Sequence, residues 1–405
     1  MLSIMETHAT LLNIGDGMKK IAILTTTRAD YGLLSPIIKK MMLVDDLEVA
    51  VLATGTHLSP DFGMTINEIV ADGVQVDAKI NILSNSDTPV AVSRAMGIAI
   101  SKFSEYFEKN KPNALLVLGD RYECLAVCLA AQNSRIPIIH LHGGEITEGA
   151  IDNAIRHAIT KLSYLHFAST EEYRNRIIQM GEEPSRVFNV GAVGVENALN
   201  LPLLSKTECE SKLNLSLDKY ALLTFHPVTL ENQTAEHQTN ELLKTISKYN
   251  DITFICTKAN ADMDGRKINE LIEKYSNKYG NIKLFDSLGS KLYLSLMKNA
   301  LFVVGNSSSG IIETPSFKIP TINIGDRQKG RTQANSIINC APVSSDINKA
   351  ITTALSDEYR GKVRSCKNPY EGKATSDTIV NVVKEWLFLD KLKIQKKFYD
   401  ILQNK

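Results

Sequence analysis

Several features that mark large classes of proteins are missing from this sequence of 405 residues. Its apolar runs stay short of the roughly 18–20 residues that span a bilayer, and residues 1–17 lack the basic and apolar segments of a cleavable secretory signal. The six cysteines show no Cys-x-x-Cys spacing. Cys124 and Cys128 are four positions apart on a predicted helix, which favours two buried thiols over a metal site. We therefore expect a cytoplasmic protein with no membrane contact and no metal.

A surplus of either charge is missing as well. The chain has 46 Lys and Arg against 45 Asp and Glu, a formal net charge of +1, and no long run of one sign. Nucleic acid and anionic membrane surfaces are therefore not expected as partners. The glycine fingerprint Gly-x-Gly-x-x-Gly is absent after the first predicted strand, so we expect no nicotinamide cofactor.

What the sequence does contain is an alternation of short apolar runs with longer amphipathic stretches. This pattern predicts strands and helices in turn, and thus parallel sheets covered by helices on both faces. A chain of 405 residues also exceeds the size of one ordinary core. We expect an α/β protein with two Rossmann-like, doubly wound domains facing across a cleft. The predicted limits are 1–17 for an N-terminal extension, 18–197 and 198–376 for the two domains, and 377–405 for a closing helical segment that packs back on the N-terminal domain.

Polar residues cluster directly after the predicted strands. Open α/β sheets bind their ligands beyond the carboxyl ends of the strands. Six polar loops at that edge therefore predict a ligand site between the two domains. These loops are residues 27–32, 120–123, 142–145, 226–227, 258–260 and 306–310.

One stretch, Leu301–Glu313 (LFVVGNSSSGIIE), joins an apolar strand to a helical pattern through small residues. Backbone N–H groups of such a turn and of the first helical turn converge on one point, where the helix dipole favours an anion. Glu313 is well placed to accept hydroxyls, for example from a ribose, so a phosphate and a sugar together suggest a nucleotide. The alternative is an ordinary helix capped by a serine.

Eight segments carry a resemblance to a known family: TRADYG, GDRYE, HLHGGEITEGAIDNAIRHAITKLS, STEEYR, VFNVGA, FHPVT, GNSSSGIIETPS and INIGDRQKGR. From about Lys19 to near residue 380 the chain resembles the hydrolysing UDP-N-acetylglucosamine 2-epimerases of sialic acid biosynthesis. Closely similar enzymes act on UDP-N,N′-diacetylbacillosamine in legionaminic acid biosynthesis. The resemblance implies a GT-B-like fold of two Rossmann-like domains with the active site between them, a homodimer or homotetramer, and no cofactor.

The same resemblance assigns residues to the nucleotide. It implies that Ser307 and Ser308 hold the diphosphate, that Arg28 and Arg327 neutralise it, and that Glu313 accepts the ribose hydroxyls. The residues expected to contact UDP are Arg28, Arg121, His226, Asn260, Ser287, Ser307, Ser308, Glu313 and Arg327, with the loop around Ser287 beside the uracil.

Asp120 and Asp152 match acidic residues that the family uses in catalysis. From the residues alone, Asp120 fits a cap on the following helix, and Asp152 fits a helix-start charge ahead of Arg156. His142 stands where many relatives have a glutamate, and histidine can act as acid or base near neutral pH. We expect Asp120, His142 and Asp152 to carry the proton transfers, with Glu145 in reserve.

The expected reaction converts UDP-N-acetylglucosamine and water to N-acetylmannosamine and UDP through 2-acetamidoglucal, at the start of sialic acid biosynthesis. UDP-N,N′-diacetylbacillosamine is the alternative substrate. Two other classes remain open. A GT-B glycosyltransferase would bind UDP equally well but require an acceptor. A nucleotide-sugar sensor could lack Asp120 and Asp152, both of which are present.

Overall fold

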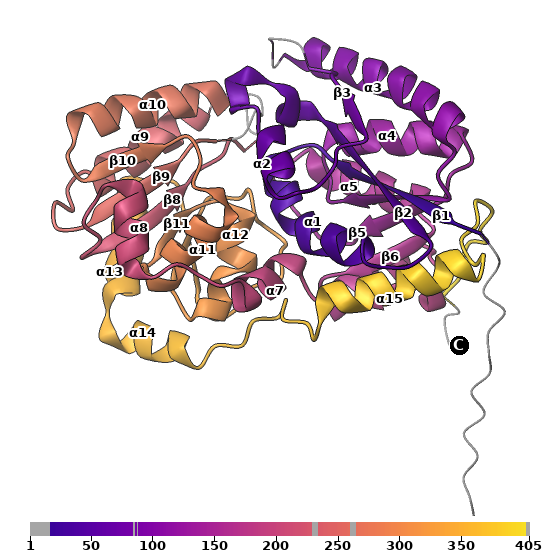
Figure 1. Ribbon diagram of the computed structural model, residues 1–405. Helices are drawn as coiled ribbons and strands as arrows, with labels where there is room; N and C mark the ends of the chain where they lie inside the picture. Colours follow the sequence, from indigo (N-terminus) through magenta and orange to yellow (C-terminus); the bar gives the residue numbers. More distant parts are fainter. Residues whose placement is uncertain (1–16, 84–85, 87, 229–233, 260–264, 402–405) are drawn as a thin grey trace, which may run out of the picture.

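The computed structural model describes residues 17–83, 86, 88–228, 234–259 and 265–401. Within them the chain folds into two parallel β-sheets flanked by helices, which confirms the expected α/β class with two doubly wound sheets (Figure 1). The strand order is β3-β2-β1-β4-β5-β6-β7 in the first sheet and β10-β9-β8-β11-β12-β13 in the second. In both sheets the first strand of the chain lies inside the sheet. The next two strands extend the sheet to one edge, and the later strands extend it to the other edge.

The first sheet and its helices come from the N-terminal half of the chain. The strands are β1 (Lys19–Thr25), β2 (Leu47–Thr54), β3 (Ala78–Ile80), β4 (Ala114–Leu118), β5 (Ile138–Leu141), β6 (Leu165–Ala168) and β7 (Val187–Asn189). The helices are α1 (Arg28–Met41), α2 (Ile66–Ala71), α3 (Pro89–Asn110), α4 (Tyr122–Asn133), α5 (Asp152–Leu162), α6 (Glu171–Gln179) and α7 (Val193–Asn200), with short 3-10 turns η1 (Gly55–Leu58), η2 (Pro60–Phe62) and η3 (Pro184–Arg186).

The second sheet follows. Its strands are β8 (Tyr220–Thr224), β9 (Thr253–Thr257), β10 (Ile282–Phe285), β11 (Val303–Gly305), β12 (Thr321–Ile324) and β13 (Ile337–Cys340). The remaining helices are α8 (Lys206–Leu213), α9 (Ala235–Ile246), α10 (Gly265–Lys278), α11 (Gly289–Asn299), α12 (Ser308–Ile312), η4 (Thr314–Phe317), α13 (Ser344–Leu355), α14 (Asp357–Arg364) and α15 (Thr375–Phe388). No helix in the described part of the chain is long and apolar enough to cross a bilayer.

Strand β1 shows why the strands appear in the sequence as unbroken apolar runs. Ile21 and Ile23 belong to the core under α1, while Ala22 and Leu24 belong to a second core under α3 and α4. Side chains alternate across a strand, so a strand that is buried on both faces needs apolar residues at every position.

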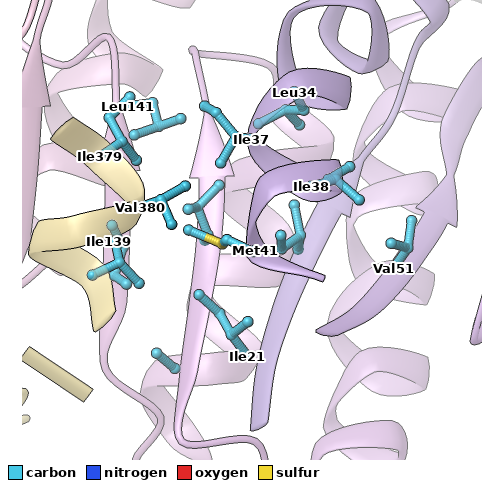
Figure 2. Close-up of a cluster of buried hydrophobic side chains, with 14 of the residues drawn as sticks. Ile21, Leu34, Ile37, Ile38, Met41, Val51, Ile139, Leu141, Ile379 and Val380 are labelled. Atoms are coloured by element: carbon cyan, nitrogen blue, oxygen red, sulfur yellow. The ribbon is translucent and has the colours of Figure 1, made fainter. Parts of the chain in front are cut away.

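The C-terminal helix α15 completes the core of the first sheet. Val380 of α15 packs with Met41 of α1 over Ile139 of β5 (Figure 2). The segment that leads into α15 runs beside the segment that precedes α7, since Ala192 N–H donates to the Tyr370 carbonyl at 2.9 Å. We keep residues 197 and 376 as proposed domain limits.

The chain after α15 differs from the helix expected over 377–405. The helix ends at Phe388, and residues 391–401 form neither helix nor strand. An extended chain lets Lys396 reach the buried carboxylate of Glu182, with Nζ 2.8 Å from both oxygens. The Tyr399 N–H also donates to the Gly181 carbonyl at 2.9 Å. These contacts with the first half replace the helical hydrogen bonds that the charged tail was expected to make.

Candidate active site

The loop after β5 meets a loop of the second sheet. Residues 142–151 and residues 325–336, between β12 and β13, are joined by a hydrogen bond of 3.0 Å from the Glu148 N–H to the Lys329 carbonyl. Glycine permits this approach, because a Cβ at Gly149 would lie 2.7 Å from the Asp326 carbonyl oxygen. The two sheets therefore contact each other through loops at the carboxyl ends of their strands.

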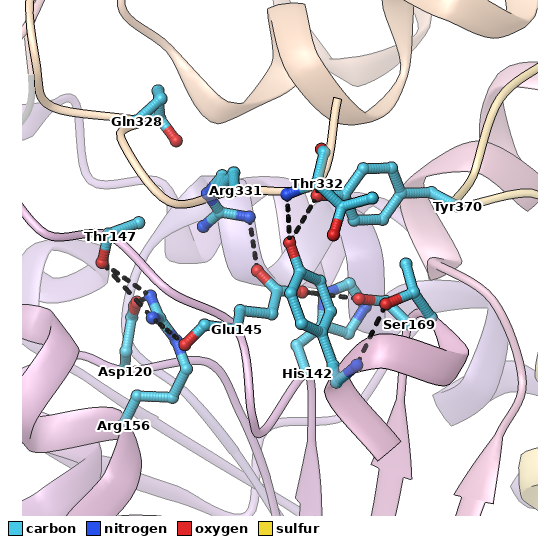
Figure 3. A network of polar contacts seen from close by, with 12 residues as sticks. Asp120, His142, Glu145, Thr147, Arg156, Ser169, Gln328, Arg331, Thr332 and Tyr370 are labelled. Carbon is cyan, nitrogen blue, oxygen red and sulfur yellow. Dashed lines mark hydrogen bonds and ion pairs between the residues drawn. The ribbon is translucent and has the colours of Figure 1, made fainter. Parts of the chain in front are cut away.

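Glu145 lies at the centre of this contact (Figure 3). Its carboxylate accepts a hydrogen bond from Ser169 Oγ at 2.8 Å, lies 3.1 Å from Nδ1 of His142, and forms an ion pair with Arg331 of the opposite loop. Burial acts to raise the pKa of Glu145, but the Arg331 charge and the hydrogen bonds of His142 and Ser169 outweigh burial and lower the pKa to about 2. Glu145 is therefore ionised at neutral pH and poorly matched to exchanging a proton there.

The two ring nitrogens of His142 differ, because Nδ1 faces Glu145 and Nε2 does not. Nε2 is buried and has no hydrogen-bond partner among the described residues. The backbone of His142 is left-handed, with a φ of 64°, which costs about 1–2 kcal/mol for an L-residue. Its N–H donates to the Phe167 carbonyl of β6 at 2.9 Å, and a Cβ at Gly144 would lie 2.4 Å from the Tyr173 carbonyl. Gly144 thus lies in a closely packed turn that fixes the backbone of His142.

Asp120 forms an ion pair with Arg156, an almost fully buried residue of α5. Helix α4 begins at Tyr122 and its N-cap is Arg121, so Asp120 is not the cap of that helix. Arg156 also donates through Nη1 to the Glu145 carbonyl at 2.8 Å. Burial lowers the pKa of Arg156 well below its usual range. A buried cation is costly without a partner, so this pair holds Asp120 at the sheet edge beside the Glu145 loop.

Asp152 is the first residue of α5 and is partly exposed. An acidic residue in the first turn stabilises a helix through its dipole, so the position fits the helix-start alternative. A part for Asp152 in catalysis stays a prediction. Its neighbour Asn153 anchors the loop, because Oδ1 accepts a hydrogen bond from the Thr147 N–H at 2.9 Å.

On the second sheet, Asn306 joins three loops. Its amide group accepts from the His226 N–H at 2.7 Å and donates to the His226 carbonyl at 2.8 Å, which ties the end of β8 to the end of β11. The Asn306 carbonyl accepts from Gln328 Nε2 at 2.9 Å and from Arg327 Nη1 at 3.2 Å. His226 and Arg327, both expected beside UDP, are thus brought together around the serine turn.

Ser307 is the N-cap of α12, and its hydroxyl accepts a long hydrogen bond of 3.4 Å from the Ser309 N–H. The serine-capped helix considered above is therefore present, with Ser308 as its first residue. Ser287 is exposed. Asn260 lies outside the described residues. Contacts of these side chains with UDP stay predictions.

Arg28 is the first residue of α1. Thr27 and Asp30 hold the start of this helix through a capping box. Nη1 of Arg28 is a buried atom with no hydrogen-bond partner in the described part of the chain, and it lies 4.0 Å from Glu68. Burial lowers the pKa of Arg28, with Glu68 opposing the shift. A partly exposed guanidinium with one buried nitrogen that lacks a hydrogen-bond partner among the described residues suits an anionic ligand.

Glu313 follows α12 and is almost fully buried. Burial raises the pKa of Glu313 to about 7, against the opposing effects of a Ser309 hydrogen bond and the Arg331 charge. Oε2 has no hydrogen-bond partner among the described residues. Such an acceptor suits a hydroxyl donor, as the ribose prediction requires.

Arg121 contacts Glu123 through both sides of its guanidinium. Nε lies 3.2 Å from Oε2 and Nη2 lies 3.2 Å from Oε1, and the Glu123 side chain is fully buried. Its contact with UDP stays a prediction.

A family model described as UDP-N-acetylglucosamine 2-epimerase matches residues 40–384. The chain belongs to this family. A Campylobacter jejuni relative named GDP/UDP-N,N′-diacetylbacillosamine 2-epimerase (hydrolyzing) is 44% identical and covers 84% of this chain and 89% of the relative. The polysialic acid biosynthesis protein P7 of Escherichia coli is 38% identical and covers 95% and 98%.

Solved structures of epimerases share the fold. The UDP-GlcNAc 2-epimerase of Neisseria meningitidis, bound to UDP-GlcNAc, aligns with a TM-score of 0.76 at 21% identity over 90% of this chain and 100% of that chain. The Methanocaldococcus jannaschii enzyme in complex with UDP-GlcNAc and UDP aligns with a TM-score of 0.74 at 21% identity over 90% and 99%. These likenesses confirm the GT-B-like two-domain fold that the resemblance implied.

Three residues around the candidate site of this epimerase family member were not singled out from the sequence: Arg156, Ser169 and Arg331. All three lie within the segments that carry the resemblance. Arg331 could have been suspected, because it follows Arg327 in a charged loop at a strand end. Its pairing with Glu145, 186 positions away, has no signature in residue spacing.

Proposed function

We propose that the protein is a hydrolysing 2-epimerase that converts UDP-N-acetylglucosamine and water to N-acetylmannosamine and UDP. The observation that carries the proposal is the position of Glu145, which lies beside His142 and pairs with Arg331 of the loop 325–336 of the second sheet. Through Arg156, Asp120 is held near the loop of the first sheet that carries Glu145. The edge of the first sheet supplies groups that exchange protons and one cation, Arg28. The facing edge of the second sheet supplies a further cation and backbone donors for a diphosphate.

The reaction needs both kinds of group. Loss of the proton at C2 and expulsion of UDP from C1 gives 2-acetamidoglucal, and water then adds to C1 while a proton returns to C2 on the other face. Negative charge develops on the β-phosphate during expulsion and must meet cations and N–H dipoles. We assign this work to Arg28, to Arg327 and to the turn at Ser307 and Ser308. The buried Nη1 of Arg28, which lacks a hydrogen-bond partner among the described residues, supports its part.

The two proton transfers require groups on opposite faces of the sugar ring. Asp120, His142 and Asp152 are the candidates, and the low pKa of Glu145 argues for a different role for that residue. We assign Glu313 to the ribose hydroxyls. Further proposed UDP contacts are Arg121, His226, Asn260 and Ser287. We also propose a cytoplasmic homodimer or homotetramer that works without a cofactor.

UDP-N,N′-diacetylbacillosamine is the second candidate substrate, and the relatives support it. Besides the Campylobacter jejuni relative, a Legionella pneumophila relative named for this substrate is 33% identical, whereas the Neisseria meningitidis relative named UDP-N-acetylglucosamine 2-epimerase is 30% identical. The sugars differ at C4 and C6, where hydroxyls give way to an acetamido group and a methyl. A pocket that hydrogen-bonds the hydroxyls rejects the methyl strongly, whereas an apolar pocket discriminates much less.

The test is a side-by-side assay of both nucleotide sugars in D₂O without any acceptor. We expect UDP release and a free 2-epimerised sugar that carries deuterium at C2. UDP release only on addition of an acceptor would instead identify a glycosyltransferase, and a product with only its original hydrogen at C2 would exclude an elimination that exchanges the C2 proton with solvent. A kcat/KM at least tenfold higher for the bacillosamine derivative, about 1.4 kcal/mol of transition-state preference, would assign the second substrate.

A further inference from the structure

The two ring nitrogens of His142 have unequal surroundings. Nδ1 lies 3.1 Å from Oε1 of Glu145, whereas Nε2 is buried with no hydrogen-bond partner in the described part of the chain. An ionised carboxylate only accepts hydrogen bonds. In the neutral imidazole, Nδ1 therefore carries the hydrogen and Nε2 carries the lone pair.

His140, two residues earlier, shows the opposite case. Its Nε2 lies 2.8 Å from the Gly119 carbonyl, which only accepts, and its Nδ1 lies 3.3 Å from the Thr160 hydroxyl. Both nitrogens are occupied, and burial lowers the pKa of His140 to about 3, against the Gly119 hydrogen bond. His140 is a structural residue. His142 differs from His140, because its Nε2 has no hydrogen-bond partner among the described residues and can contact a bound molecule.

Glu145 is fully engaged by its surroundings. The Ser169 hydroxyl donates to Oε1 at 2.8 Å, and Arg331 pairs with Oε2. The loop that carries Arg331 is itself anchored on the first half of the chain, since the Thr332 N–H donates to the Tyr173 hydroxyl at 2.9 Å. With both oxygens held, the Glu145 carboxylate can orient a neighbour but has little freedom to approach a substrate.

We propose that Glu145 is a positioning residue that fixes the tautomer of His142, that Nε2 of His142 is the atom that exchanges a proton with C2 of the sugar, and that Arg331 holds Glu145 from the second sheet. This inference rests on the proposed function. In the elimination direction, the Nε2 lone pair takes the C2 proton, the C2–H electron pair forms the C1=C2 bond, and the C1–O pair leaves with UDP. In the reverse direction the imidazolium returns the proton to C2. Glu145 stabilises the imidazolium in either case.

The position of Arg331 makes this arrangement depend on both sheets. Arg331 belongs to the loop that also carries Arg327, which we assign to the diphosphate, and it contacts Glu145 across the boundary between the two sheets. When the loops separate, Glu145 loses its cation and His142 loses a fixed partner. Nucleotide binding and the orientation of the proton-transfer group are thereby connected through one loop.

The first measurement is the nitrogen NMR spectrum of the parent protein labelled in histidine, with His142 assigned by comparison with the His142→Gln variant. We expect a protonated Nδ1 and an unprotonated Nε2 for His142 at pH 8. A protonated Nε2 would overturn the proposal. This readout needs no turnover, so it tests the inference even if neither nucleotide sugar is a substrate.

The second measurement uses Glu145→Gln. The amide oxygen should face Arg331, which turns the NH₂ group toward His142 and forces the hydrogen onto Nε2. We expect the reversed tautomer in the spectrum and a kcat reduced at least about a hundredfold, with UDP affinity retained. Glu172→Gln is the matched control, because Glu172 also crosses the sheet boundary, to the Thr332 hydroxyl at 2.6 Å, without contacting His142. It should keep the parental kcat and tautomer.

Each outcome of these experiments is decisive. Near-parental kcat in Glu145→Gln, or a lost kcat with an unchanged His142 tautomer, would remove the positioning role. If Glu145→Gln does not fold, Ser169→Ala removes one hydrogen bond to the same carboxylate and should lower kcat more than it raises KM, whereas an unchanged kcat would count against the proposal. Arg331→Lys should recover more activity than Arg331→Met, and equal loss in the two variants would exclude the charge of Arg331 as the holding force.

Discussion

A Cβ on Gly194 would lie 2.0 Å from Oε1 of Glu313. Helix α7 therefore accommodates the Glu313 carboxylate only because its second residue has no side chain. Glu313 comes from the second sheet, so its carboxylate is enclosed by both halves of the chain. This enclosure is the physical reason that burial raises the pKa of Glu313.

Glu313 predicts a dependence of stability on pH. Its pKa is about 7 in the fold against an ordinary value of 4.5. The folded protein therefore retains a proton that the unfolded chain loses, and this stabilisation, complete below pH 4.5, disappears as the pH rises through 7. Glu313→Gln cannot titrate, so its Tm should rise relative to the parent between pH 4.5 and about 8. A difference in Tm that stays constant over this range would contradict the prediction.

Asp120→Asn should separate catalysis from binding. The variant keeps the shape of the side chain but loses the charge that pairs with Arg156. We expect UDP affinity to stay nearly intact while UDP release falls at least about a hundredfold, the usual scale for a positioned acid or base. Ser308→Ala and Arg28→Ala should instead weaken UDP binding in titration calorimetry. Normal turnover in Asp120→Asn would leave Asp120 as a structural partner of Arg156.

Position 142 should require a group that transfers protons. His142→Ala should lose most turnover, whereas His142→Glu, which restores the residue found in many relatives, should retain part of it. The retained part should be limited, because a second carboxylate beside Glu145 is disfavoured in its ionised form. The check is the rate of UDP release for both variants. A fully active His142→Ala enzyme would transfer the role to another group or to water.

Gly149→Ala should disturb the contact between the two loops. The new Cβ would lie 2.7 Å from the Asp326 carbonyl oxygen, and a backbone atom has little room to yield. We expect a loss of about 1–3 kcal/mol in the free energy of unfolding and a lower kcat. Gly280→Ala is the control, since a Cβ there meets nothing within 4 Å. Denaturant unfolding of both variants makes the comparison, and equal stabilities would show that the loop contact adapts.

The sequence predicted the sheets well because of how they are buried. In β1, Ile21 and Ala22 lie in cores on opposite faces, so the strand had to appear as an apolar run. The polar loops could be placed for the same reason, because each one begins where such a run stops. The prediction that the helix continues after Phe388 was wrong. The conformation of this tail is set by one distant carboxylate, Glu182, and not by local helical preference.

The inner structure of the site could be predicted only in part. Asp120, His142 and Glu145 follow strands β4 and β5, which are neighbours in the sheet, so their proximity follows from topology. The partners that decide their chemistry do not follow from it. The pair of Arg331 and Glu145 depends on how two separate sheets are placed against each other, and no periodicity within either sheet encodes that placement.

The chain passes between the two halves twice, at α7 and again before α15. The segments that precede α7 and α15 lie side by side: the Ala192 N–H donates to the Tyr370 carbonyl at 2.9 Å, and a Cβ at Gly191 would lie 2.4 Å from Gly372. Two adjacent covalent connections form a hinge, which allows the two halves to rotate about one axis and resists sliding or twisting of one half against the other. Opening of the molecule should therefore be a rotation about this one axis. In it, the loops at 142–151 and 325–336 separate while the segments at 190–192 and 370–372 stay joined.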